Sequence, residues 1–87
     1  MAEDLVGVVI NFYARPGVAA IKVTGGSIKK GDILKYKGRT TDFTEAVDSI
    51  EIEKTPVDEA KTGDLAGVKV GERVRENDRV YKGVKET

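Results

Sequence analysis

The chain has 87 residues with no cysteine and no histidine, and its 15 basic and 15 acidic residues cancel to a net charge of zero. This length fits one domain, residues 1–87, that can bury only roughly 60–65% of the surface exposed by its unfolded chain. The lack of cysteine excludes disulfides and thiolate metal sites and agrees with a reducing compartment. No apolar run approaches the roughly 18 residues of a spanning helix, so we expect a monomeric, cytoplasmic protein without membrane contact.

The N-terminal residues predict two strands joined by a turn. Apolar residues recur at two-residue intervals rather than at helical spacing, and ten glycines divide the chain into short segments. The first strand covers residues 5–13, and its buried face is expected to carry Val6, Val8, Ile10 and Phe12. The sequence ARPG makes a tight turn, and residues 18–23 form the second strand. We therefore expect an all-β fold without a long helix.

The third strand, residues 32–36, separates an apolar face from a basic face. Alternation places Leu34 and Tyr36 on the core side and the neighbouring Lys35 and Lys37 on the solvent side. Tyr36 is therefore expected in the core, away from the lysines.

A change of phase marks residues 43–54. Apolar residues occupy odd positions in the first part of this segment and even positions, Ile50 and Ile52, in the second part. One residue has to be absorbed if the strand is continuous, so the pattern predicts a β-bulge near Asp48 or Ser49.

The last third of the chain alternates connections with strands. Residues 55–64 are expected to form a connection, 65–70 a strand, 72–78 a connection or short strand, and 79–84 the last strand. Six short strands at this spacing predict a small closed or nearly closed antiparallel β-barrel of six or seven strands, because closure removes exposed strand edges. The expected core residues are Val8, Ile10, Ile21, Leu34, Ile50, Ile52, Val68 and Val80.

Three strands are preceded by the same kind of dipeptide. Gly31-Asp32, Gly63-Asp64 and Asn77-Asp78 each place an aspartate after a residue that tolerates the left-handed conformation. This arrangement is typical of turns that lead into a strand.

The composition leaves little catalytic chemistry. Without histidine and cysteine, the commonest general base, soft metal ligands and thiol nucleophile are missing. Glu51 and Glu53 are paired on one strand face, but such pairs are usually solvated, and no segment has the spacing of a calcium loop. We therefore expect no enzymatic activity, no metal site and no cofactor.

The charges are unevenly distributed along the chain. Residues 25–41 carry five basic groups and one acid, whereas residues 42–64 carry eight acids and two basic groups. Two interpretations of the basic run stay open: a solvated barrel face, or a surface that contacts phosphates and is modest in affinity and sensitive to salt. The candidate phosphate contacts are Arg15, Lys29, Lys30, Lys35, Lys37 and Arg39.

Three segments together resemble a known family. GVAAIKVTGGSIKKGDILKYKG, VDSIEIEKTPVDEAKTGDLAGVKV and RENDRVY, over residues 7–82, are similar in order and spacing to domain II of translational GTPases such as elongation factor Tu. The resemblance implies a barrel of the translation-protein type that contacts the tRNA acceptor end or ribosomal RNA. It places Glu51 and Lys54 where the family has a glutamate and an arginine that pack on the terminal adenosine. Lysine departs from this pattern because its ammonium group cannot stack on a base as guanidinium does.

Two functions from different classes follow from this resemblance. No G-x-x-x-x-G-K-[ST] motif is present, so we expect neither GTP binding nor GTP hydrolysis. The first hypothesis is an accessory module that contacts tRNA or ribosomal RNA. The second is a protein-interaction barrel that docks onto a partner enzyme without contacting RNA, since similar barrels are attached to collagenase-like peptidases linked to tRNA modification.

Overall fold

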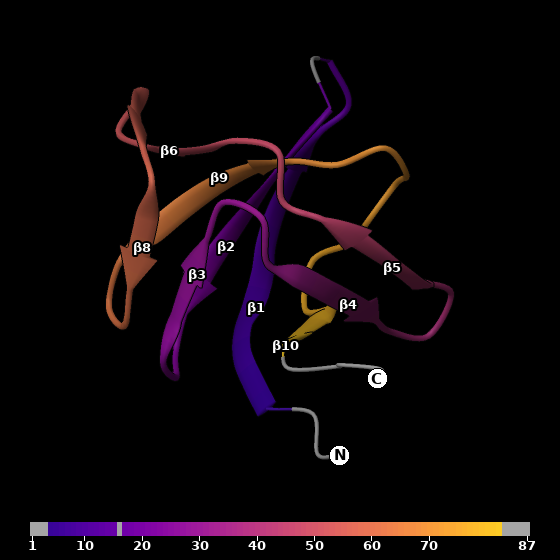
Figure 1. Ribbon diagram of the computed structural model, residues 1–87. Helices are drawn as coiled ribbons and strands as arrows, with labels where there is room; N and C mark the ends of the chain where they lie inside the picture. Colours follow the sequence, from indigo (N-terminus) through magenta and orange to yellow (C-terminus); the bar gives the residue numbers. More distant parts are fainter. Residues whose placement is uncertain (1–3, 16, 83–87) are drawn as a thin grey trace.

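The computed structural model describes residues 4–15 and 17–82, which form two β-sheets and no helix (Figure 1). The strands are β1 (Asp4–Tyr13), β2 (Val18–Val23), β3 (Ser27–Lys29), β4 (Ile33–Lys37), β5 (Asp42–Ala46), β6 (Ile50–Ile52), β7 (Thr55–Val57), β8 (Glu59–Lys61), β9 (Leu65–Lys69) and β10 (Arg79–Lys82). This confirms the all-β prediction. Within these residues, no helix has the length and apolar character needed to cross a membrane. The expected last strand extends to residue 84, and its final two positions lie outside the described residues.

The larger sheet curls into an open half-barrel. Its eight strands follow the order β5-β4-β10-β1-β2-β9-β6-β7, and every described pairing is antiparallel. The expected closed barrel of six or seven strands is therefore wrong, because β5 and β7 form two separate edges. The edges are kept short or covered instead: β7 has three residues, and the carboxylate of Glu45 on β5 accepts the Gly71 N–H at 3.0 and 3.1 Å.

A two-stranded ribbon of β3 and β8 completes the core. Ile28 and Ala60 face each other at its centre, and both are fully buried in the main hydrophobic cluster. The prediction that residues 55–64 form only a connection is wrong, since β7 and β8 lie within this segment. β8 was missed because its pairing partner β3 is distant in sequence, whereas β7 pairs with the neighbouring β6 through a tight turn that the sequence pattern did not indicate.

Most of the predicted core residues are buried. Ile21, Leu34, Ile50, Val68 and Val80 are at most 1% exposed, and Ile52 packs against the cluster from its margin.

The buried face of β1 was predicted correctly only in part. Val6 is buried and Phe12 packs against the core, as expected. However, Val8 is half-buried and Ile10 is 39% exposed, whereas Val9 enters the core. The register of β1 shifts between Leu5 and Gly7 against β10, and between Val9 and Asn11 against β2. Each irregularity reverses the alternation of side chains, so strict period-two counting fails here.

Residues 43–54 do not form one bulged strand. β5 and β6 lie near opposite ends of the sheet order, and the three residues between them cross from one to the other. Val47 in this crossing is buried, and its backbone bonds to the Asp32 carbonyl and the Gly31 N–H, both at 2.9 Å. The phase change is real, but a change of strand causes it rather than the predicted bulge near Asp48 or Ser49.

The three predicted turns into strands are confirmed. The residues before the aspartates have φ values of 95° at Gly31, 97° at Gly63 and 77° at Asn77. Each aspartate carboxylate accepts the backbone N–H three residues earlier, at 2.8 to 2.9 Å. The donors are the backbone amides of Lys29, Lys61 and Arg75.

Candidate functional site

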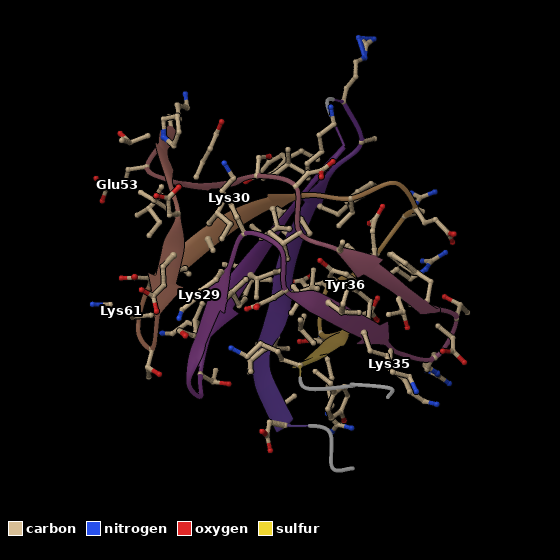
Figure 2. All side chains as sticks on the ribbon, in the orientation of Figure 1. Lys29, Lys30, Lys35, Tyr36, Glu53 and Lys61 are labelled. Carbon is tan, nitrogen blue, oxygen red and sulfur yellow. The ribbon has the colours of Figure 1, made fainter. Side chains whose placement is uncertain are left out.

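The fold separates the predicted basic run into two groups. Lys29 and Lys30 lie with Lys61 around β3 and β8, whereas Lys35 lies across the molecule on β4 (Figure 2). Lys29 also pairs in register with Glu59, which offsets its charge locally. The run is therefore not one continuous cationic surface.

Alternation along β4 is as predicted. Lys35 and Lys37 point to the outer face, while Tyr36 is 1% exposed and stacks on Phe43, with ring centroids 4.8 Å apart and planes at 18°. Burial, with a smaller contribution from the charge of Glu45, raises the pKa of Tyr36 well above its ordinary value. Tyr36 is thus a core residue and presents no ring to a ligand.

The remaining predicted residues lie elsewhere. Glu51 is exposed on β6, and Lys54 occupies the tight β6–β7 turn, where Glu53 and Lys54 both have positive φ values of 53° and 64°. These strands lie at the other end of the sheet order from β4, and Arg15 is in the turn between β1 and β2. The eight predicted site residues do not converge on one surface.

A different set of cations does converge. Two adjoining hollows of about 390 and 310 Å³ share Gly38, Arg39 and Asn77 in their lining, and we call them together the basic pocket. Its full lining is Lys37, Gly38, Arg39, Arg75, Glu76, Asn77, Asp78, Arg79 and Tyr81. Lys37 and Arg39 belong to the predicted run, whereas Arg75 and Arg79 were missed. The pairing of β10 with β4 places Arg79 beside Lys37, and sequence alone does not show that pairing.

One wall of the basic pocket is the turn from Arg75 to Asp78. Asp78 is 4% exposed, and its carboxylate accepts the Arg75 N–H at 2.8 Å. The turn is fixed to β1 by two backbone bonds, from Asn77 N–H to the Val9 carbonyl at 2.7 Å and from Val9 N–H to the Asp78 carbonyl at 2.8 Å. The buried aspartate therefore sets the position of Arg75.

The opposite wall is the β4–β5 turn, which depends on a glycine. The Gly38 N–H donates to the Thr41 carbonyl at 2.7 Å, and a Cβ at Gly38 would collide with the Asp78 carboxylate. Only a residue without a side chain allows the two turns to touch. This contact places Arg39 beside the turn that carries Arg75.

The basic pocket has an excess of positive charge. Among the described residues, the charged side-chain groups of its four cations form no hydrogen bond or ion pair. The acids nearby are exposed Glu76, buried Asp78 and Asp42, which faces Lys37 across the β4–β5 pair. Guanidinium groups in such a setting can hold a carboxylate or a phosphate through paired hydrogen bonds. Over the same described ranges, no group of three or more acidic, histidine or cysteine residues is arranged to hold a metal ion.

Apolar side chains lie directly beside the basic pocket. In the β1–β10 pairing, Leu5 faces Tyr81 and Val8 faces Arg79. Leu5 is 47% exposed, and Val8 and Tyr81 are half-buried. Cations and apolar groups therefore lie side by side on the outer face of the sheet.

The chain is similar in sequence to parts of longer proteins that are named as peptidases. It is 42% identical over 77 residues to an uncharacterized protease of Methanocaldococcus jannaschii, and 32% identical over 81 residues to a collagenase of Porphyromonas gingivalis. These matches cover 87% and 92% of this chain, but only 19% and 22% of the relatives, so the chain spans about a fifth of their length. No family model matches the chain.

Solved structures share the fold. The C-terminal domain of a Geobacillus thermoleovorans protein described as a U32 peptidase superposes with a TM-score of 0.84, covering 92% of both chains at 19% identity. The selenomethionine variant of that domain has a TM-score of 0.83 and covers 88% of this chain and 96% of that chain, again at 19% identity. At this identity the likeness concerns the fold.

These relatives overturn the resemblance to elongation factor domain II. The features shared with that family were strands with alternating side chains and Gly-Asp turns. Both are common in small antiparallel sheets, whose tight turns favour these residues. The translation-factor function with its tRNA or ribosomal RNA contact is contradicted, because the relatives are named as protease, collagenase and U32 peptidase. The same names contradict the expectation of no enzymatic activity, although the chain matches only a part of each curated relative.

Proposed function

We propose that this chain is a counterpart of the C-terminal domain of U32 peptidases and that it works together with the peptidase part of such an enzyme. The observation that carries the proposal is the fold match to that domain, which covers 92% of both chains. The 42% identity to a segment of a protein named as a protease supports it independently. The activity proposed for the whole protein is peptide-bond hydrolysis, to which this domain contributes a rigid sheet with an open outer face.

A domain exchange in the Porphyromonas gingivalis collagenase tests this function. The matching 81-residue segment is deleted in one variant and replaced by this chain in another, and collagen hydrolysis is measured for both and for the parent. We expect the deletion to lose activity and the replacement to restore much of it.

A matched control separates a specific effect from the mere presence of extra residues. Replacement by this chain carrying Ile21→Asp places a charge at a fully buried position, where it cannot be hydrated, and the domain should not fold. This control should be as inactive as the deletion. A folded but inactive exchange of the unmodified chain, or a fully active deletion, would contradict the proposed function.

A further inference from the structure

The basic pocket and its apolar neighbours have the composition of a protein-binding surface. Arginine and tyrosine are enriched where proteins bind each other, and here Arg75, Arg79 and Tyr81 lie together with exposed Leu5. The three acids at the pocket, Glu76, Asp78 and the neighbouring Asp42, are fewer than its four cations, so carboxylates from outside the domain can complete the hydrogen bonds of these cations.

A phosphate chain fits this surface less well than a polypeptide. A nucleic acid needs a continuous track of cations, but the lysines around β3 lie across the molecule from β4 (Figure 2). The apolar groups of Leu5 and Val8 beside the cations match alternating acidic and apolar side chains of an extended segment. The observations therefore favour an acidic polypeptide.

We propose that the basic pocket docks an acidic segment of the peptidase part, which rests on the proposed function above. Carboxylates of that segment bind Arg39, Arg75 and Arg79, and its apolar side chains cover Leu5, Val8 and Tyr81. We assign the acidic segment to the peptidase part of the enzyme because the matched segment makes up only 19% to 22% of the curated relatives. Most of such a relative therefore lies outside the matched segment.

The binding chemistry is tested on the whole chain with defined probes. A synthetic 12-residue peptide of alternating glutamate and leucine is titrated at low salt, with amide chemical shifts followed by NMR. We expect saturable binding with the largest shifts at Arg39, Arg75 and Arg79. The same peptide with glutamine in place of glutamate should bind far more weakly, and equal binding of the two peptides would overturn the proposal.

Charge reversal locates the binding. The double variant Arg75→Glu, Arg79→Glu should weaken the glutamate peptide by roughly tenfold or more, since each change replaces attraction by repulsion. The matched control Lys61→Glu, Lys69→Glu changes two exposed lysines outside the pocket and should bind as the parent does. Failure of the glutamate peptide to bind, or equal binding by the pocket variant, would overturn the proposal. A 12-nucleotide oligouridylate that binds the pocket more tightly than the peptide would also overturn it.

The source of the acidic segment is tested in the collagenase exchange. The exchanged enzyme with Arg75→Glu and Arg79→Glu should lose most of the restored activity, while the one with Lys61→Glu and Lys69→Glu should keep it. If the exchange restores activity equally with both pairs, the docking proposal fails while the proposed function stands. If the unmodified exchange restores nothing, the proposed function fails, whatever the peptide titration shows.

Discussion

The contact between Gly38 and Asp78 makes a quantitative prediction, because it joins the two turns that form the basic pocket. In Gly38→Ala, the new methyl group would collide with Asp78 Oδ1 and lie 2.7 Å from Asp78 Cγ. Real Cβ atoms essentially never come this close to another heavy atom, so the carboxylate has to move away. It would then lose its 2.8 Å bond from the Arg75 N–H.

The expected cost follows from two opposing effects. A hydrogen bond to a charged group contributes about 1.5–3 kcal/mol. Alanine in place of glycine offsets roughly 0.4–1 kcal/mol of this by restricting the unfolded chain. The free energy of unfolding should therefore fall by about 0.5–2.6 kcal/mol, which lowers the melting temperature by roughly 4–8 °C per kcal/mol for a domain of this size. A chain of 87 residues has on the order of 4–13 kcal/mol to lose, so the variant should still fold.

A double-mutant cycle identifies the collision as the cause. Urea unfolding is followed by circular dichroism for the parent, Gly38→Ala, Asp78→Ala and the double variant. Without the carboxylate there is nothing to displace, so Gly38→Ala should be nearly neutral in the Asp78→Ala background. If its cost is the same in both backgrounds within about 0.5 kcal/mol, the collision is not the cause and the account of the two turns is wrong.

Three further predictions concern the turn at Gly63, the buried side chain of Tyr36 and the hydrogen bond of Lys82. Gly63→Ala should cost roughly 1–3 kcal/mol in urea unfolding through backbone strain alone, because φ is 97° and the added methyl meets nothing within 4 Å; a neutral result would contradict this. Since folding raises the pKa of Tyr36, its stabilising contribution is complete below the unfolded value near 10 and is lost as pH rises above it. Tyr36→Phe should flatten the loss of stability between about pH 9 and 11, and an unchanged pH profile would contradict this. Lys82→Met should cost about 1–3 kcal/mol because Lys82 Nζ donates to a backbone carbonyl of β3 at 2.6 Å and lies 3.4 Å from Asp32; unchanged unfolding would show that this link contributes nothing.

The resemblance to a translation factor shows how local patterns can mislead. The Gly-Asp turns at residues 31–32 and 63–64 are real, and each aspartate bonds as expected. They report the chemistry of a turn that needs positive φ and an acceptor for a free N–H, and any small antiparallel sheet can use it. Their order along the chain therefore does not identify a function.

The amino-acid pattern is enough to predict the features that depend on neighbours a few residues away. These include the all-β class, the alternation along β4 that buries Tyr36, and the three turns that end in Asp32, Asp64 and Asp78. Each depends on side-chain alternation or on a hydrogen bond within four residues, so the local pattern is enough.

The features that depend on which strands pair could be seen in the folded structure alone. The irregularities of β1 exchanged Val8 for Val9 in the core, and the crossing at Val47 separated β5 from β6. The basic pocket was hidden for the same reason: Lys37 and Arg79 are 42 positions apart and become neighbours only through the β4–β10 pairing. Strand pairing is set by the burial of the whole core and by the register of distant segments, and neither can be inferred from the pattern of one segment alone.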